Sequence, residues 1–155
     1  MTDHPFRTTG LRHGTDDPRG LMERIDAQLA ERIEEAVEMA ALHLLVELRK
    51  RHNRPAPETN SQEDRREFQA LAGDLFAHLG RAFEADLDAE RLPGLERART
   101  GSAEPRAREL RVQIFLARQL PDYWRRLDSY RAAHAEARLA SPPPSASFLK
   151  RLFNP

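Results

Sequence analysis

Apolar residues recur at helical spacing in three stretches of the chain. In the first stretch, the apolar positions three or four residues apart are Ile25, Leu29, Ile33, Val37, Ala40, Leu44 and Leu48. Such spacing places apolar side chains on one face of an α-helix. Asp17-Pro18 suits a helix start and Pro55 a helix end, so we predict a first helix from residue 17 to about residue 54. Leu42, Leu45 and Val46 widen the apolar arc, which predicts cover on two sides at that end.

The second stretch follows a turn-forming segment, residues 55–61, and opens with the acidic pair Glu63 and Asp64, which favour a helix start. Its apolar positions share the same spacing: Phe68, Leu71, Ala72, Leu75, Phe76, Leu79, Phe83 and Leu87. We predict a second helix that runs to Leu92, where Pro93-Gly94 stops it. The connection that follows, residues 93–103, has room for one short turn at residues 95–99.

The third stretch keeps its apolar period across a proline. Its periodic positions are Val112, Leu116, Leu120, Tyr123, Leu127, Tyr130 and His134. Because the phase does not slip at Pro121, we predict one long helix over residues 104–140, kinked near Pro121. A full break at Pro121 is the alternative, and it would give four helices.

Composition supports a helical fold. Val and Ile together number only six, so the β-branched residues that favour sheets are scarce. We therefore predict an all-α fold: an elongated antiparallel three-helix bundle over residues 17–140, with helices of about 50 Å each. Leu110, Ile114 and Phe115 make the start of the third helix apolar on several sides. A homodimer, through a coiled-coil type of contact, would cover it.

The two ends of the chain differ from the bundle. Residues 1–16 show no apolar period and predict a disordered arm. Residues 141–147 form a Pro-rich linker, and residues 148–155 a short docking peptide. As a helix, this peptide would place Phe148, Leu149, Leu152 and Phe153 on one side and Lys150 and Arg151 on the other. It either folds back on its own bundle or docks on a partner protein, and we favour the partner.

The formal charge balances at 25 basic and 25 acidic residues, but it is unevenly distributed. Residues 1–103 carry −5 and residues 104–155 carry +5. Much of the positive charge forms a strip on the third helix: Arg108, Arg111, Arg118, Arg125 and Arg126. We interpret this strip as a solvated face or a contact for an acidic protein, and keep a nucleic-acid-binding accessory protein as the alternative. Trp124, beside these arginines, is the predicted contact residue of the bundle.

Candidate chemistry is sparse. The chain has no cysteine, so disulfides, thiolate metal sites and cysteine nucleophiles are excluded. We find no catalytic motif and predict no enzymatic activity, no catalytic residue and no cofactor. His43 with Glu47, and Asp74 with His78, have the i, i+4 spacing of paired metal ligands. We interpret them as surface pairs, with a helical metal-binding protein as a further alternative.

These observations predict a non-enzymatic adaptor or accessory protein. Its helical bundle would bind one protein partner or a second copy, while the tethered peptide Phe148–Phe153 engages another partner. No secretory signal is visible, so we expect a cytoplasmic protein. The most apolar run, residues 40–46, is far shorter than the roughly 20 residues of a membrane span.

Overall fold

Every regular element in the described part of the chain is helical. The computed structural model describes residues 18–87 and 92–141. The helices within these ranges are α2 (Pro18–Arg51), α3 (Gln62–Asp86), α4 (Leu95–Arg99), α5 (Pro105–Gln119) and α6 (Tyr123–Ala140). The all-α prediction is confirmed for these residues. The predicted disordered arm, most of the Pro-rich linker and the docking peptide lie outside them.

The helix starts follow the local chemistry of the sequence. Pro18 opens α2, where its missing N–H costs no hydrogen bond. Ser61 caps α3, its hydroxyl oxygen accepting a bond from the backbone N–H of Asp64 at 3.2 Å. In α3 the helix ends at Asp86, before the predicted end at Leu92, and Leu87 closes it by donating its N–H to the Phe83 carbonyl.

The predicted single third helix is divided in two. Between α5 and α6, Leu120 has an extended backbone, with φ −101° and ψ 117°. A residue before proline avoids the helical region, and here the bend also buries the Leu120 side chain. The predicted kink is therefore wrong, and the alternative, a full break at Pro121, is what the structure has. The short helix α4 is an additional element.

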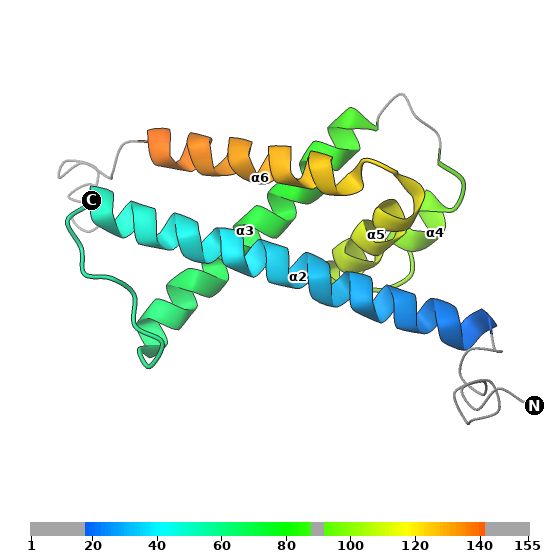
Figure 1. Cartoon of the computed structure of the whole chain (residues 1–155), viewed down its shortest axis with the longest axis horizontal. Helices are drawn as coiled ribbons and strands as arrows, with labels where there is room; N and C mark the ends of the chain where they lie inside the picture. Colours follow the sequence, from blue (N-terminus) through cyan, green and yellow to red (C-terminus); the bar gives the residue numbers. More distant parts are fainter. Residues whose placement is uncertain (1–17, 88–91, 142–155) are drawn as a thin grey trace, which may run out of the picture.

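The arrangement also differs from three rods of equal length. Helix α2 has 34 residues and spans about 51 Å, whereas α3 has 25 residues and spans about 38 Å. Figure 1 shows α2 and α6 running in the same direction while α3 crosses them obliquely. Helices α4 and α5 gather beside the N-terminal half of α2 (Figure 1). Both α2 and α3 contact α5 and α6, so the core forms where α3 crosses them.

Helix α4 covers the segment that we expected a second copy to cover. Leu95 and Ala98 of α4 pack against the core, and Phe115 of α5 is buried. This contact removes the physical reason given for a homodimer at α5, although the homodimer itself stays a prediction. The predicted apolar stripes otherwise supply the core, whose residues include Ile33, Val37, Leu44, Leu75, Leu79, Phe83, Leu116, Tyr123 and Leu127.

Candidate functional site

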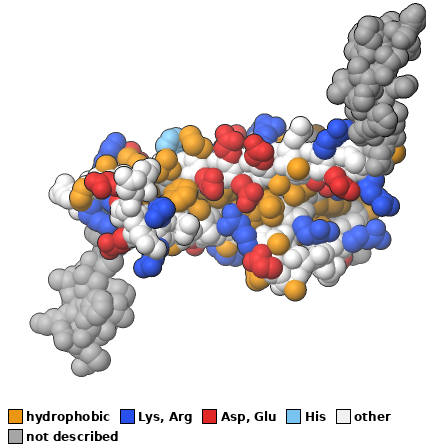
Figure 2. All heavy atoms as spheres, turned by 90° about the horizontal axis from the view of Figure 1, so that it is seen from below, with side chains coloured by type: hydrophobic (Ala, Val, Ile, Leu, Met, Phe, Trp, Pro, Cys, Tyr) orange, Lys and Arg blue, Asp and Glu red, His pale blue; other side chains and the backbone are white. Residues whose placement is uncertain are grey.

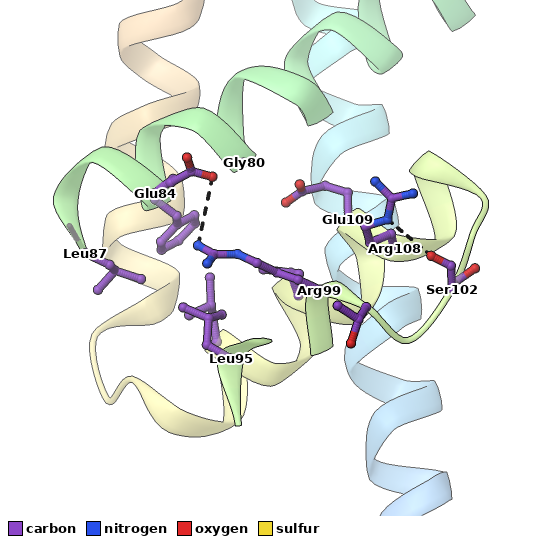
Figure 3. Close-up of a pocket in the computed structure, with 12 residues that line it drawn as sticks. Gly80, Glu84, Leu87, Leu95, Arg99, Ser102, Arg108 and Glu109 are labelled. Atoms are coloured by element: carbon purple, nitrogen blue, oxygen red, sulfur yellow. Dashed lines mark hydrogen bonds and ion pairs between the residues drawn. The ribbon is translucent and has the colours of Figure 1, made fainter. Parts of the chain in front are cut away.

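A cavity of about 530 Å³ lies between α3, α4 and α5. Figure 3 shows it, with an apolar floor and charged side chains from three helices. Its lining residues are Gly80, Phe83, Glu84, Leu87, Leu95, Arg99, Thr100, Ser102, Arg108, Glu109, Val112 and Leu116. The charges on this lining balance, with two arginines and two glutamates.

Most polar groups of this cavity are bonded to their own surroundings. Arg99 pairs with Glu96 at 2.8 Å and lies 3.9 Å from Glu84. Arg108 donates to the backbone carbonyl of Ser102 at 3.2 Å (Figure 3). The Thr100 hydroxyl donates to the backbone carbonyl of Glu96. These bonds are mostly local, and they leave the Thr100 hydroxyl and both guanidinium groups engaged.

Glu109 is a half-buried acid of the cavity. Figure 3 shows its side chain extending toward Gly80, and a Cβ on Gly80 would lie only 2.6 Å from a Glu109 carboxylate oxygen. Burial raises the pKa of Glu109, while a hydrogen bond from Gln113 opposes the rise. The Glu109 carboxylate therefore lies in space that a side chain on Gly80 would occupy.

A second, more apolar surface lies at the other end of α3. We call it the α2–α3 groove; it has a volume of about 350 Å³. Its lining residues are Leu42, Leu45, Pro57, Glu58, Thr59, Asp64, Arg65, Phe68 and Gln69. Leu42 is 42% exposed at the surface, whereas Leu45 is buried. This groove offers apolar side chains that no helix of the described chain covers.

Arg49 holds the walls of the groove in place. Its guanidinium donates to Asp64 at 2.7 Å, to Glu67 at 2.5 Å and to the Pro55 carbonyl at 3.2 Å. The Arg49 residue is only 4% exposed. Hydrogen bonds from Arg49 lower the pKa of Asp64, so this carboxylate stays ionised and the pair stays formed. The end of α2, the connecting turn and the start of α3 are thereby fixed together.

Trp124, the predicted contact residue, is half-buried at the start of α6. The Arg32 guanidinium carbon of α2 lies 3.8 Å from the centre of its ring, in a cation–π contact. Tyr123 packs edge-on against the ring at 5.0 Å between centroids. Its use as a partner contact stays a prediction, and Arg32 would have to move to expose that face.

The predicted arginine strip is divided by the break at Pro121. Arg108, Arg111 and Arg118 lie on α5, where Arg118 pairs with Asp26 of α2 at 3.5 Å. Arg125 and Arg126 lie on α6, and each pairs with Asp122 at 3.0 Å. Figure 2 shows acidic and basic side chains interspersed on the face it presents. Nucleic-acid binding stays a prediction, which a salt-dependent binding titration tests.

The two predicted metal pairs lie on different helices, and Asp74 and His78 contact residues of α6. Asp74 accepts hydrogen bonds from His134 and from Arg138 of α6, both at 2.9 Å. His78 packs against His134 with ring centres 4.9 Å apart. His43 and Glu47 line a shallow groove between α2 and α6. Among the residues described, no group of three or more His, Asp or Glu side chains is placed to hold a metal ion.

The predicted docking residues Phe148, Leu149, Lys150, Arg151, Leu152 and Phe153 lie outside the described residues. The structure does show where the chain leaves the helical body. Arg51, the last residue of α2, donates to the backbone carbonyl of Leu139 in α6 at 3.4 Å. The C-terminal ends of α2 and α6 are therefore neighbours (Figure 1).

Comparisons with known proteins found no matching protein family, no matching curated protein and no matching solved structure. Within residues 18–87 and 92–141, no helix is both long and apolar enough to cross a membrane.

Sequence reasoning missed the α2–α3 groove and the buried Gln113, which binds Glu109 of the other cavity. Gln113 interrupts an apolar stretch of the third helix, and that interruption was the available signal for a buried polar residue. Leu42 and Leu45 were recognised as widening the apolar arc of α2. The prediction of cover on two sides was correct for Leu45 but not for Leu42, which the structure leaves at the rim of the α2–α3 groove.

Proposed function

We propose that this protein is a non-enzymatic adaptor that binds partner proteins through its helical body and through the tethered peptide Phe148–Phe153. The α2–α3 groove carries the proposal for the body, because its apolar side chains are left uncovered by the rest of the described chain. Trp124 stays a predicted second contact. The polar groups of the α3–α4–α5 cavity, in contrast, are bonded within their own surroundings.

The groove suits one short amphipathic helix. Such helices bury two or three apolar side chains, spaced by three or four residues, in a hydrophobic groove. Each fully buried Leu or Phe contributes about 1.5–3 kcal/mol relative to an exposed one. Arg49 and its ion pairs hold the groove walls before binding, which lowers the entropy cost of association.

The tethered peptide adds a second point of attachment. The linker joins it to the end of α6, so a partner held by the body meets the peptide at an effective concentration of about millimolar. Two weak contacts then give a stronger joint affinity without any new interaction. This is the physical advantage of an adaptor with a rigid body and a short tethered motif.

The test replaces an exposed groove residue without disturbing the core. In the full chain, Leu42→Glu places a charge at the groove rim, and we expect it to abolish the capture of body-bound partners. Ala27→Glu adds the same charge to another exposed position of α2 and serves as the matched control. Phe148→Ser with Phe153→Ser tests the peptide separately.

Partners are identified by affinity enrichment and mass spectrometry, then titrated directly against each purified variant. Circular dichroism must show the same helicity for all the variants. A partner set and affinities that are the same for wild type, Leu42→Glu and the peptide variant would refute the adaptor proposal.

A further inference from the structure

The point where the chain leaves the helical body lies close to the α2–α3 groove. Arg51 of α2 contacts the Leu139 carbonyl, so α6 ends beside the end of α2. Leu45, in the groove, precedes Arg51 by six residues, which is about 9 Å along the helix axis. A chain that leaves α6 reaches the groove by passing around a helix about 10–12 Å wide.

The linker is long enough for that path. Seven residue steps separate Ser141, just after α6, from Phe148. At about 3.1 Å per residue, the extended conformation that proline-rich sequences favour covers about 22 Å. Half the circumference of a helix 10–12 Å wide is about 16–19 Å, so a diagonal path around α2 that also covers the axial distance is about 18–21 Å long, just below this limit. The length of the linker therefore allows the docking peptide to reach the groove of its own chain.

Peptide and groove are complementary in chemistry. The peptide offers two Phe and two Leu side chains, and the groove offers Leu42, Leu45, Pro57 and Phe68. Lys150 and Arg151 separate the apolar pairs of the peptide, and the exposed Glu58 of the groove carries the opposite charge. The second carboxylate of the lining, Asp64, is already bound to Arg49, and Arg65 is the one basic residue of the lining.

The neighbouring groove between α2 and α6 fits the peptide less well. Its lining includes three alanines, Ala40, Ala132 and Ala135, and two leucines, of which Leu44 is buried and Leu139 is half-buried. Alanines offer a phenylalanine ring little contact area. The α2–α3 groove presents more large apolar surface, because Leu42 is exposed and Pro57 and Phe68 are half-buried.

We propose that Phe148–Phe153 docks in the α2–α3 groove of its own chain and is displaced there by the partner peptide. This inference rests on the proposed function and adds its regulation. The tethered peptide competes with the partner for the groove at an effective concentration of about millimolar. Only a partner that binds tightly, or through two points, therefore displaces the peptide from the groove. Release of the peptide then makes both binding elements available together.

The absence of cysteine from the chain allows a direct test. The full chain with Arg65→Cys and Asn154→Cys has one thiol at the groove and one directly after the peptide in the sequence. Ala132→Cys with Asn154→Cys is the matched control for the α2–α6 groove, since Ala132 lies on α6 about 14 Å along the axis from Ser141. Both introduced body positions are exposed.

Under mild oxidation at low protein concentration, we expect the Arg65→Cys pair to form an intrachain disulfide at least about tenfold faster than the control. Non-reducing gels separate the compact monomer from crosslinked dimers. Adding Phe148→Ser and Phe153→Ser must remove the difference. Equal rates of crosslinking for the two cysteine pairs would overturn the proposal. A disulfide that forms only between chains would also overturn it, because the occupant of the groove would then be the peptide of a second copy.

The crosslinking experiment uses purified protein without any partner, so its result is independent of partner capture. If crosslinking fails, the adaptor proposal stands on the capture experiment alone. If crosslinking succeeds while Leu42→Glu leaves capture unchanged, the groove serves only the chain's own peptide, and the part of the proposed function that assigns partner binding to the groove fails.

Discussion

Gln113 shows how a single polar residue is accommodated in the core. It is fully buried, at 0% exposure, and both ends of its amide are bonded. The nitrogen donates to Glu109 at 2.9 Å, and the oxygen accepts from the Tyr123 hydroxyl at 2.8 Å. Burial raises the pKa of Tyr123, so its hydroxyl stays protonated and remains a donor. This chain of bonds ties α5 to the first residue of α6.

Removing the Tyr123 hydroxyl is expected to destabilise the protein. Tyr123→Phe leaves the buried Gln113 carbonyl without its partner, which costs about 1–3 kcal/mol. Urea unfolding followed by circular dichroism measures the change. Tyr130→Phe is the matched control, because the Tyr130 hydroxyl donates to Asp86, an exposed residue, and its loss should cost about 0.5 kcal/mol or less. Equal losses in the two variants would contradict this account.

At the scale of elements, the short helix α4 decides how α5 is covered. The chain enters α4 through Gly94, whose φ of +92° lies in the left-handed region that glycine tolerates best. A Cβ at this position would lie 3.0 Å from the Phe115 ring of α5. A five-residue helix cannot form alone in water, so α4 depends on this tight approach.

Gly94→Ala is therefore expected to loosen α4 from α5. The left-handed conformation costs an alanine about 1–2 kcal/mol, and crowding against Phe115 adds to this. Urea unfolding measures the loss. Gly73→Ala is the contrasting variant, because a Cβ there meets nothing within 4 Å and α3 gains about 0.5–1 kcal/mol from an alanine. Stabilisation by both substitutions would refute the role of Gly94.

At the scale of the whole molecule, two clusters of charge tie α3 to its neighbours. Arg49 of α2 binds Asp64 and Glu67, and His134 of α6 binds Asp74. The bond from His134 lowers the pKa of Asp74. Burial lowers the pKa of His78, and the nearby His134 and Arg81 lower it further. All these shifts are downward, so at these groups the unfolded chain binds more protons than the folded one, whereas the raised pKa of Glu109 acts in the opposite direction.

Stability is consequently expected to fall as the pH falls. The contribution of His78 is complete above its unfolded pKa of about 6.5 and is lost below it, while those of Asp74 and Asp64 are lost below about pH 4. Urea midpoints at pH 7.5 and pH 5.5 should show the first loss in the wild type. His78→Gln should reduce it, because glutamine does not titrate. A midpoint that rises toward pH 5.5, or an equal fall in the variant, would contradict this prediction.

The amino-acid sequence by itself determined the helical class, the starts of α2 and α3 and most of the core, and it placed a short turn where α4 lies. Helical period and capping residues act over a few neighbours along the chain, so they can be read locally. His134 was placed on the apolar stripe of the third helix, and the structure buries it at 6% exposure.

The tertiary structure alone decided the break at Pro121, the oblique crossing of α3 and the two cavities. An unbroken apolar period is compatible with a kinked helix and with two separate helices. Which of the two forms depends on the distant residues that pack around Leu120 and Tyr123. Arg49 binds Asp64, Gln113 binds Tyr123 and Asp74 binds His134, and these partners are 15, 10 and 60 positions away along the chain. Local pattern carries no information about such pairings, because they follow from helix packing.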